Sequence, residues 1–402
     1  MRVCHICSCF VPSRGGVETF VYQLCKALVA RAHIVRVITG SRGKPPATYR
    51  EKMDGIDVIR YPERHFFLET PLLTRVIFRL MKEKYDILHV HGMVPTLTEL
   101  ALLVGHLKRK PVVLTYHYDA ETLGHGFIGV MANRAYSFLM KVLVPKLADR
   151  IVSTSSSYAA TSSVLPYCRE KLVIIPAGVG AEFLGNPGPM HKRKNGHADS
   201  EDENPGSGKR TVLYVGKLQK YKGIENLIAA FDSVRRAIPE ARLEIVGDGP
   251  QRRQLKALTK RLGLDRYVGF RGWIPQDRLV KTLEESTVFV LPSIRSRREA
   301  FGIVVLEAMA AGKPVIVSKI PGPESLVEDG KNGLLVPPGQ PKELADAIVR
   351  VLQNERLMNA MAEYASQKAR NFSWPSITER YQALYRELVS DRSPDYQSQA
   401  SM

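Results

Sequence analysis

Two glutamates bracket an apolar segment in the second half of the chain. Glu299 and Glu307 stand at the two ends of EAFGIVVLE, and the residues from 301 to 311 have helical spacing. Gly302 therefore falls near a helix N-terminus, where unpaired backbone amides can bind a phosphate. Acidic residues on a helix usually form only a solvated face, but the apolar neighbours argue against that here. Because carboxylates accept hydrogen bonds from sugar hydroxyls, we expect both to face a ligand with two sugar units flanking a pyrophosphate.

A glycine precedes the first helical pattern in each half of the sequence. GVETFVYQL begins at Gly16 and GIENLIAAF begins at Gly223, and each follows a strand-like run. Glycine lets the backbone turn sharply at such a position and leaves amides free to face a ligand. The two halves are therefore expected to share one plan.

The elements that must position these residues are short β-branched runs alternating with helical patterns. VCHIC, DILHVHG, PVVLTYH and RIVST form one series, and TVLYVGKL, RLEIVGDGP, TVFVLPS and KPVIVSK form another. Such spacing predicts parallel sheets, whose ligands bind at the carboxyl ends of the strands. The expected fold is α/β, with two Rossmann-like doubly wound parallel-sheet domains facing across a cleft.

Length and local composition set the expected domain boundaries. A chain of 402 residues is long for one hydrophobic core. We expect an N-terminal domain over 1–184 and a C-terminal domain over 210–371. A stretch rich in Gly, Pro, Asn and charge predicts a flexible linker over 185–209. A closing helix is expected over 372–389, followed by a disordered tail over 390–402.

Charge and cysteine content narrow the function classes. The net charge of +18 favours anionic partners such as nucleotides, anionic lipids or nucleic acid. The basic residues are dispersed and no nucleic-acid-reading module is recognisable, so we expect no nucleic-acid partner. The cysteines lack the spacing of a zinc site and predict reduced, buried thiols. Strand-like residues from Arg2 onward and the lack of an apolar run of about 18 residues predict a cytoplasmic protein.

The order of strand LPS, loop, Glu-Ala-Phe-Gly and helix resembles the retaining glycosyltransferases of family 4, which have the GT-B fold. The resemblance covers nearly the whole chain. It includes the glycine pair after the first strand, the segments VGDGP and GWI of the second half, and FSWPSITERYQALYREL, which is similar to the family's closing helix that crosses back onto the first domain.

The resemblance implies roles for individual residues that bind the donor. Glu307 is expected to bind the ribose hydroxyls and Glu299 to contact the transferred sugar as a catalytic residue. Lys217 and Lys222 match the family's basic pair, although the family has arginine where this chain has Lys217, so the bidentate fork is lost. The remaining donor-binding residues implied by the resemblance are Gly15 and Gly16 at the diphosphate, Ile274 at the base, and the backbone of Phe301, Gly302 and Ile303 at sugar and phosphate.

His117 stands just past a predicted buried strand, in VVLTYHYDA. Position alone favours a structural histidine bonded to backbone. The resemblance instead implies a catalytic residue whose ring faces the transferred sugar and steadies the positive charge that develops on it. Asp119 and Glu121 are the rival candidates for a base or nucleophile.

The reaction that the resemblance implies is transfer of a hexose-type sugar, with retention, from a nucleotide-diphosphate sugar to a lipid-linked, saccharide or small-molecule acceptor. An epimerase that acts on nucleotide sugars, with the same fold, is the alternative. No Asp-x-Asp pair lies in a structured segment, so we expect neither a metal nor a cofactor. Lys217, Lys222 and the helix N-terminus would stabilise the leaving diphosphate instead.

One further segment predicts a membrane contact. Thr70-Pro71 is a plausible helix start, and residues 71–84 form a basic amphipathic pattern. Packing of the apolar face on the protein's own sheet is the first interpretation. Contact of the basic face with an anionic membrane is compatible with it and would place the protein peripherally at the inner face of the membrane. The basic residues of the pattern are Arg75, Arg79 and Lys82, and the apolar ones are Leu72, Leu73, Val76, Ile77 and Leu80.

Overall fold

The structure is a computed structural model, and it forms two compact units. Unit 1 comprises Met1–Gly178 and Trp374–Met402, and unit 2 comprises Val179–Ser373. The first crossing between the units therefore follows Gly178, a few residues before the boundary expected at 184. The residues that the structure describes are 1–13, 15–41, 48–62, 66–67, 70–71, 74–119, 126–184, 210–295 and 298–392.

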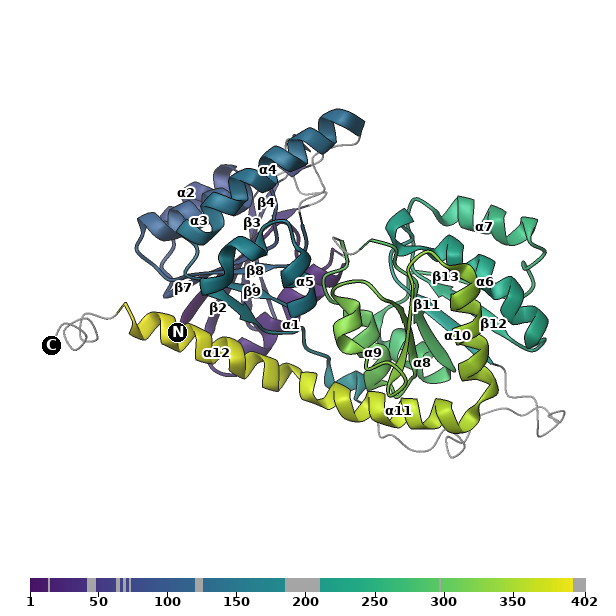
Figure 1. The fold of residues 1–402 in the computed structure, drawn as a ribbon. Helices are drawn as coiled ribbons and strands as arrows, with labels where there is room; N and C mark the ends of the chain where they lie inside the picture. The colour runs from purple at the N-terminus through teal and green to yellow at the C-terminus, as the bar shows by residue number, and fades with distance from the viewer. Residues whose placement is uncertain are drawn as a thin grey trace. The chain divides into compact units, whose positions relative to one another are not determined.

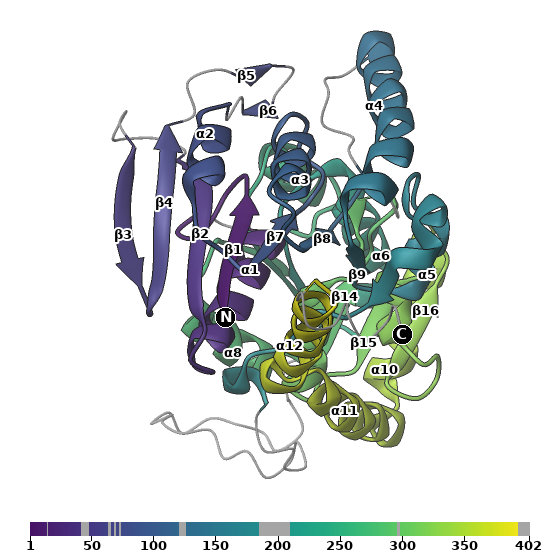
Figure 2. The ribbon, with the colours of Figure 1, turned by 90° about the vertical axis from the view of Figure 1, so that its left-hand side faces the viewer.

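Unit 1 is built on an eight-stranded sheet with the order β10-β9-β8-β7-β1-β2-β4-β3 among the described residues. Figure 2 shows β3, β4, β2, β1 and β7 side by side in this order. All neighbours pair in parallel except β3 and β4, which are antiparallel. The strands are β1 (Arg2–Cys7), β2 (Ile34–Ser41), β3 (Tyr49–Met53), β4 (Ile56–Pro62), β7 (Ile87–His91), β8 (Val112–Tyr116), β9 (Arg150–Ser153) and β10 (Leu172–Ile174).

Helices cover both faces of this sheet (Figure 1). The helices α2, α3 and α4 lie on one face, and α1 and α12 pack against each other on the opposite face. The central strands β7 and β8 are consequently buried along their whole length, as parallel strands between two helical layers are. The helices are α1 (Gly16–Val29), α2 (Thr74–Lys82), α3 (Leu97–Leu107), α4 (Gly126–Leu147), α5 (Ser156–Thr161), the 3-10 helix η1 (Leu165–Lys171) and α12 (Trp374–Ser390).

Unit 2 repeats the plan with a six-stranded parallel sheet in the order β13-β12-β11-β14-β15-β16. The helices α6, α7 and α10 lie on one face, and α9 and α11 pack together on the other (Figure 1). The strands are β11 (Thr211–Val215), β12 (Arg242–Val246), β13 (Val268–Gly272), β14 (Val288–Leu291), β15 (Val315–Ser318) and β16 (Gly333–Val336). The helices are α6 (Ile224–Ala237), α7 (Arg252–Arg261), α8 (Gln276–Glu285), α9 (Ile303–Ala310), α10 (Pro341–Gln353) and α11 (Glu355–Ala369), with 3-10 turns η2 (Ala181–Phe183), η4 (Lys220–Lys222), η6 (Pro323–Leu326) and η7 (Arg370–Phe372).

Local details differ from the sequence-based expectations. Thr70–Pro71 is not a helix start: it forms the short strand β6, which pairs with β5 (Phe66–Phe67), and α2 begins at Thr74. Backbone pairing has overridden the local helix-start signal. The predicted linker and residues 393–402 of the predicted tail lie outside the described residues, whereas residue 390 still belongs to α12.

The predicted reduced, buried thiols are confirmed, since all five cysteines are buried and none of them forms a disulfide. Burial raises the pKa of Cys4 to about 12, so this thiol stays protonated and is a poor nucleophile. Among the described helices, none is both long enough and apolar enough to cross a bilayer.

Candidate functional site

Close backbone contacts join the carboxyl ends of β11, β12 and β13. A Cβ atom on Gly247, after β12, would lie 1.9 Å from the backbone oxygen of Gly216, after β11. The amide of Gly216 donates to Val246 at 3.0 Å, and the amide of Gly247 donates to Gly272 at 2.7 Å. Only glycine fits at Gly247, and the VGDGP motif therefore holds the loop after β11 in place.

That loop carries Lys217, which is exposed. The backbone oxygen of Lys217 accepts a hydrogen bond from the Tyr214 hydroxyl at 3.1 Å. The next amide, of Leu218, donates to Asp248 at 2.9 Å. The backbone is thus fixed on both sides while the ammonium group is free to reach an anion at the edge of the sheet.

A buried ion pair links the same loop to the acidic motif. Nζ of Lys222 donates to the Glu299 carboxylate, and the two side chains are only 11% and 10% exposed. Ser293, just after β14, donates its hydroxyl to the same carboxylate oxygen at 3.0 Å. Burial lowers the pKa of Lys222, but the negative charge of Glu299 outweighs burial, so its pKa is raised and the lysine stays charged.

The ion pair gives Glu299 a partner within the protein. Only 8% of the residue is exposed, and its carboxylate neutralises Lys222. The sequence does not reveal this pairing because the partners are 77 positions apart. Gly223, directly after Lys222, completes the arrangement: its φ is 64°, and a Cβ atom would lie 2.2 Å from the Pro292 oxygen.

The N-terminus of α9 presents backbone amides beside this pair. Gly302 is the N-cap residue with a left-handed backbone (φ 84°) and provides no side-chain cap. Phe301 is buried, with 6% exposed, and Ile303 is partly buried. Gly322, after β15, lies close to the backbone before α9: a Cβ atom on Gly322 would be 2.2 Å from the backbone oxygen of Glu299. The uncapped amides of the first helical turn therefore remain available to an anion.

Glu307 lies further along α9 and is partly buried. Burial, and secondly the negative charge of Glu182, raise the pKa of Glu307 to about 8. Glu182 belongs to η2, which packs on α9, and it accepts a hydrogen bond from Gln276 at 2.5 Å. A Glu307 side chain protonated at neutral pH has a hydroxyl that donates and an oxygen that accepts.

Ile274 follows β13 and is partly buried, next to Trp273, whose surface is 48% exposed. Gly272, which precedes them, is bonded to Gly247 as described above. The predicted base-contacting segment therefore lies at the same edge of the unit 2 sheet as Lys217. All the predicted unit 2 residues follow carboxyl ends of its strands or lie on α9.

In unit 1, Gly15 and Gly16 begin α1. Gly15 is the N-cap residue, and a Cβ atom on it would lie 2.3 Å from the Glu18 carboxylate. Phe20, on the next turn of α1, packs edge-on against the His117 ring with centroids 5.0 Å apart. The helix start and His117 are thus close neighbours at the carboxyl edge of the unit 1 sheet.

His117 follows β8 and has only 8% of its surface exposed. Burial lowers the pKa of His117 to about 3, so the ring is neutral at physiological pH. Its Nε2 lies 3.3 Å from Nδ1 of His91, on β7. Among the described residues, the hydrogen-bond partner of the His117 ring is thus a second histidine rather than a backbone group.

Asp119 is firmly held by hydrogen bonds. One carboxylate oxygen accepts from Tyr116 at 2.8 Å and from the Ser162 hydroxyl at 2.7 Å, and the other accepts from the Ser163 amide at 2.8 Å. Its own amide donates to the Tyr158 hydroxyl at 2.7 Å. These contacts leave Asp119 a structural role. Glu121, the other rival, lies outside the described residues.

Sequence reasoning missed two sets of polar residues. Ser293 could have been noticed as the polar residue that ends the apolar strand VFVLPS. His5, His89 and His91 are buried in β1 and β7. Their only signal was three histidines in otherwise apolar strands. They are also the one group of the described residues whose ligand atoms are close enough to hold a metal ion.

Comparison with known proteins agrees with this architecture. The family model of "Glycosyltransferase Family 4" matches residues 14–183, and that of "Glycosyl transferases group 1" matches residues 197–368. The chain is 29% identical to D-rhamnosyltransferase WbpZ of Pseudomonas aeruginosa, over 92% of this chain and 91% of the relative.

Two solved structures share the fold over nearly their whole length. Sucrose-phosphate synthase of Thermosynechococcus elongatus superposes with a TM-score of 0.75 at 26% identity, covering 96% of this chain and 98% of that one. Anabaena HepE in complex with UDP-glucose has a TM-score of 0.71 at 20% identity, covering 96% and 100%. The paired parallel-sheet units and these likenesses show the GT-B fold, and the two matched family models together support a glycosyltransferase of the family 4 type.

Proposed function

We propose that this glycosyltransferase moves a hexose-type sugar, with retention, from a nucleotide-diphosphate sugar to a lipid-linked, saccharide or small-molecule acceptor. The observation that carries the proposal is the buried Lys222–Glu299 pair beside the uncapped start of α9. This arrangement offers an ammonium and backbone amides to a diphosphate and a carboxylate to a sugar. The UDP-glucose complex of HepE supports a nucleotide-sugar donor.

Each part of the donor has a matching group in unit 2. The diphosphate would bind the amides of Gly302 and Ile303 and the ammonium groups of Lys217 and Lys222. The ribose hydroxyls would bind Glu307, and the base would contact the backbone at Ile274. Glu299 would accept hydrogen bonds from the transferred sugar, using the oxygen that does not receive Ser293 and Lys222.

In the proposed reaction, the bond between the anomeric carbon and the diphosphate oxygen breaks as the acceptor oxygen bonds to the same face of that carbon. The proton of the acceptor hydroxyl passes to the leaving diphosphate. Asp119 is ill suited to act as a nucleophile because its oxygens are already bonded. The ring of His117, neutral and fixed by its neighbours, would orient a sugar hydroxyl, and its backbone carbonyl would steady the positive charge on the sugar.

The positive groups of unit 2 would perform the task that a metal performs in other transferases. Lys222 remains charged in its buried pair, and Lys217 is exposed at the same edge of the sheet. Two ammonium groups and a helix N-terminus can stabilise the charge of a departing diphosphate. We therefore propose that transfer needs no metal and no cofactor.

A thermal-shift panel tests the donor site. Ligands that bind only the folded state raise its stability by mass action, so UDP, GDP and ADP and their sugars should separate by base and by sugar. The Glu307→Gln variant should lose most of the shift, whereas Glu343→Gln, at the start of α10, is a matched control that should keep it. No shift with any nucleotide would contradict the proposal.

Product analysis separates transfer from the alternative reaction. In the presence of an acceptor, the anomeric configuration of the product, read by NMR, should equal that of the donor. An epimerase would instead convert the nucleotide sugar without any acceptor. Formation of an epimerised nucleotide sugar and no transfer product would support that alternative.

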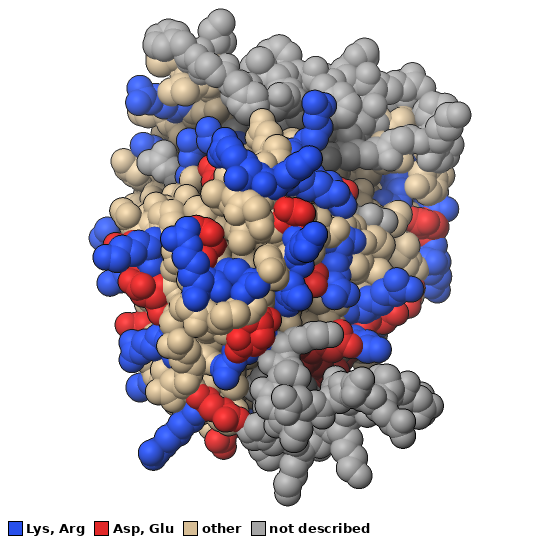
Figure 3. Space-filling view, turned by 90° about the vertical axis from the view of Figure 1, so that its right-hand side faces the viewer, with Lys and Arg blue, Asp and Glu red and all other residues tan. Residues whose placement is uncertain are grey.

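A nucleic-acid partner is less well supported by the charge distribution. On the face drawn in Figure 3, acidic side chains lie among the many lysines and arginines. Several basic residues of unit 2 are paired one helical turn away, as in Arg236–Asp232, Arg252–Asp248 and Lys281–Glu285. Nucleic-acid binding usually needs a continuous basic surface.

We further propose that unit 1 contacts an anionic membrane through α2, α3 and α4. Val76 and Leu80 of α2 are buried in unit 1, so the apolar face packs as first interpreted. Phe78 and Met81, however, are 73% and 47% exposed, beside the exposed Lys82. The side chains of Leu72, Leu73 and Arg75 are not described. Helix α3 packs against both α2 and α4. Helices α3 and α4 carry further exposed apolar residues: Leu103, Leu107, Val130, Met131, Phe138, Leu139 and Val142.

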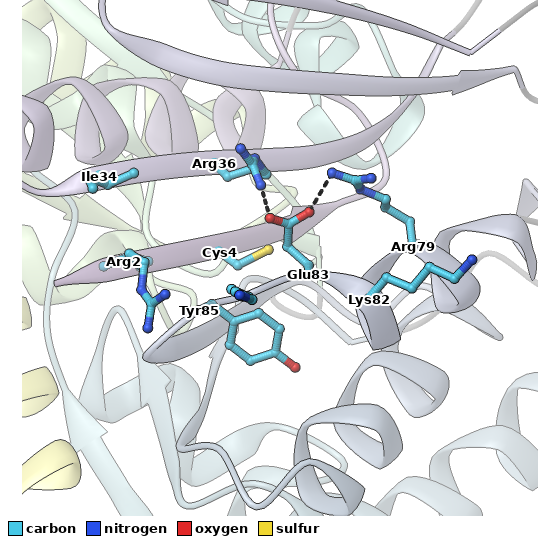
Figure 4. A pocket seen from close by; sticks show the side chains of 10 residues that line it. Arg2, Cys4, Ile34, Arg36, Arg79, Lys82, Glu83 and Tyr85 are labelled. Atoms are coloured by element: carbon cyan, nitrogen blue, oxygen red, sulfur yellow. Dashed lines mark ion pairs between the residues drawn. The ribbon is translucent and has the colours of Figure 1, made fainter.

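The pocket beside α2 limits which charges contribute to this contact (Figure 4). It has a volume of about 380 Å³ and basic residues on its rim. Glu83 points between Arg36 and Arg79 and pairs with both, and Arg2 pairs with Asp86. These arginines are already neutralised. Lys82 and Lys84, both exposed, are therefore the basic residues of this rim that we assign to the lipid surface.

Vesicle sedimentation tests the membrane contact. We expect binding to anionic but not to neutral vesicles, weakening as salt rises. Phe78→Ser with Lys82→Gln should reduce it, whereas Lys281→Gln, on unit 2, should not. Equal sedimentation with anionic and neutral vesicles at low salt would rule the contact out.

A further inference from the structure

Three histidines form a hydrogen-bonded chain that ends at His117. Nδ1 of His5, on β1, lies 2.9 Å from Nε2 of His91, on β7. Nδ1 of His91 lies 3.3 Å from Nε2 of His117, just after β8. β1, β7 and β8 are adjacent in the sheet, with His5 paired to His89 and His91 paired to Thr115, so the chain crosses the sheet at its carboxyl edge.

The ring geometry suits hydrogen bonds between imidazole edges. The planes of His5 and His91 are 13° apart with centroids 5.2 Å apart, and those of His91 and His117 are 25° and 5.6 Å apart. Phe20 packs edge-on against both His91 and His117. The three rings are therefore held in fixed orientations by packing as well as by their own contacts.

All three rings are neutral. Burial lowers the pKa of His5 and His117 to about 3 and lowers that of His91 well below its usual value. A neutral imidazole carries one N–H and one bare nitrogen. Each ring in the chain must therefore donate on one side and accept on the other, and the whole chain has a single direction.

The buried end of the chain decides that direction. Nε2 of His5 is buried and has no hydrogen-bond partner among the described residues. If the chain ran from His117 to His5, this Nε2 would carry an unpaired N–H in the core, and orphaned buried N–H groups are rare in native structures. The opposite direction leaves only a bare nitrogen there. His5 and His91 then both donate from Nδ1.

A metal site is a poorer account of the same residues. In the group His5, His89 and His91, the nitrogens of His89 are bonded to Tyr385 at 2.6 Å and to Thr115 at 2.7 Å. Nδ1 of His5 and Nε2 of His91 are bonded to each other. A metal ion would have to replace these hydrogen bonds, and only Nε2 of His5 is free to accept it.

We propose that His5 and His91 are positioning residues that hold His117 in the Nδ1–H tautomer. Its Nε2 is occupied by the His91 donor, which is the one hydrogen bond that the His117 ring forms with the described residues. Nδ1–H is consequently the group that His117 offers to a substrate hydroxyl oxygen. This inference rests on the proposed function in so far as it assigns His117 a substrate; the tautomer itself does not depend on it.

NMR of the full chain with 15N-labelled histidine tests the tautomer directly. We expect the long-range couplings of His117 to show a protonated Nδ1 and a bare, hydrogen-bonded Nε2, with the same tautomer for His5 and His91. A protonated Nε2 on His117 in the wild-type protein would overturn the proposal. So would stoichiometric zinc that survives dialysis and shifts His5, His89 and His91 together.

Variants at His91 separate positioning from general stability. His91→Leu removes the donor, so the Nε2 resonance of His117 should move, and kcat should fall about tenfold with the donor KM unchanged. His91→Asn can place an amide N–H where Nδ1 was. It should restore most of kcat and most of the wild-type position of the His117 Nε2 resonance. His89→Leu, on the same buried strand but outside the chain, is the matched control and should lower the Tm without moving the His117 resonances. Equal effects of His89→Leu and His91→Leu on His117 would refute a specific role.

The two proposals fail in different ways. If His117→Ala leaves transfer unchanged, the catalytic role of His117 is wrong, while the tautomer measured by NMR still stands or falls by itself. If His117 is catalytic but carries its proton on Nε2, the histidine chain is wrong and the proposed function remains.

Discussion

The two units place opposite kinds of chemistry at the same edge of similar sheets. In unit 1 the buried polar residues are neutral histidines bonded to one another. In unit 2 they are an ammonium and a carboxylate that neutralise each other. Neutral rings give fixed hydrogen bonds at little electrostatic cost. A buried ion pair attracts charged ligands, but each partner depends on the other to offset its desolvation.

The glycines at these edges also differ between the units in what surrounds them. In unit 2 the glycines contact backbone: Cβ atoms on Gly247 and Gly223 would lie 1.9 Å and 2.2 Å from carbonyl oxygens. In unit 1 a Cβ atom on Gly15 would meet only the flexible Glu18 side chain, and one on Gly92, after β7, would meet nothing within 4 Å. Unit 2 is therefore built as a rigid cradle, while side-chain contacts define the site in unit 1.

The largest effect should follow from splitting the ion pair of unit 2. Glu299→Ala leaves Lys222 buried without its partner, which typically costs about 3–5 kcal/mol of stability. Loss of the carboxylate should also lower transfer about a thousandfold. Denaturant unfolding and steady-state kinetics measure the two effects.

A double variant separates stability from chemistry. Glu299→Leu with Lys222→Met removes both charges and should recover most of the stability but none of the activity, because a well-packed apolar pair can replace a buried ion pair. A Glu299→Ala protein with nearly normal stability and turnover would show that the pair has neither role.

The next largest effect should come from the neutral site. His117→Ala should reduce turnover about a hundredfold, in the range of a positioned catalytic group. Nucleoside diphosphate affinity should change little, because the predicted diphosphate-binding lysines and α9 belong to unit 2. Single-turnover kinetics and calorimetric titration with the nucleotide distinguish these quantities. Unchanged turnover with weakened nucleotide binding would reverse the assignment.

The sequence predicted the parts of the site that are local. Gly302 and Glu307 follow from one helical pattern, and the two-sheet architecture follows from alternating strands and helices. The Lys222–Glu299 pair and the His5–His91–His117 chain join residues far apart in sequence, so only the fold reveals them. The helix start expected at Thr70 was wrong because pairing of β5 and β6 is a contact that local capping signals do not contain.

A smaller, pH-dependent effect should distinguish Glu307 from Glu299. The pKa of Glu307 is raised to about 8 in the folded state, above the ordinary value of 4.5. The folded state then binds more protons at Glu307 than the unfolded state does between these pH values, so the contribution of Glu307 to stability is most favourable below about pH 4.5 and becomes less favourable as pH rises to about 8. Glu307→Gln should remove this dependence, giving a higher Tm than wild type at alkaline pH.

The same variant should raise the donor KM about tenfold, because the NH2 group of an amide can only donate to the ribose, whereas the hydroxyl of the protonated Glu307 can both donate and accept. Glu343→Gln, on α10, again serves as the control. Parallel Tm profiles for wild type and Glu307→Gln across this pH range would show that burial does not raise the pKa of Glu307.

Asp119→Asn should change turnover by no more than about twofold while lowering the Tm. The amide can replace only part of the network that joins Asp119 to Tyr116, Ser162 and Ser163, and removing a buried hydrogen bond costs about 1–3 kcal/mol. Thermal unfolding and kinetics at a temperature where both proteins are folded measure the effects. If Asp119→Asn abolishes transfer and His117→Ala does not, the chemistry of unit 1 belongs to Asp119.

The smallest expected effect is that of a chelator. If Lys217, Lys222 and the start of α9 supply the positive charge for the leaving diphosphate, adding EDTA should leave the initial rate unchanged, and magnesium or manganese should not raise it. Lys217→Gln should slow transfer, because Lys217 is the exposed member of the pair, and added metal should not rescue it. Loss of activity with EDTA that manganese restores would mean that the charges of unit 2 are insufficient by themselves. The comparison between the units would then change, because unit 2 would need a metal ion in addition to its own charged side chains.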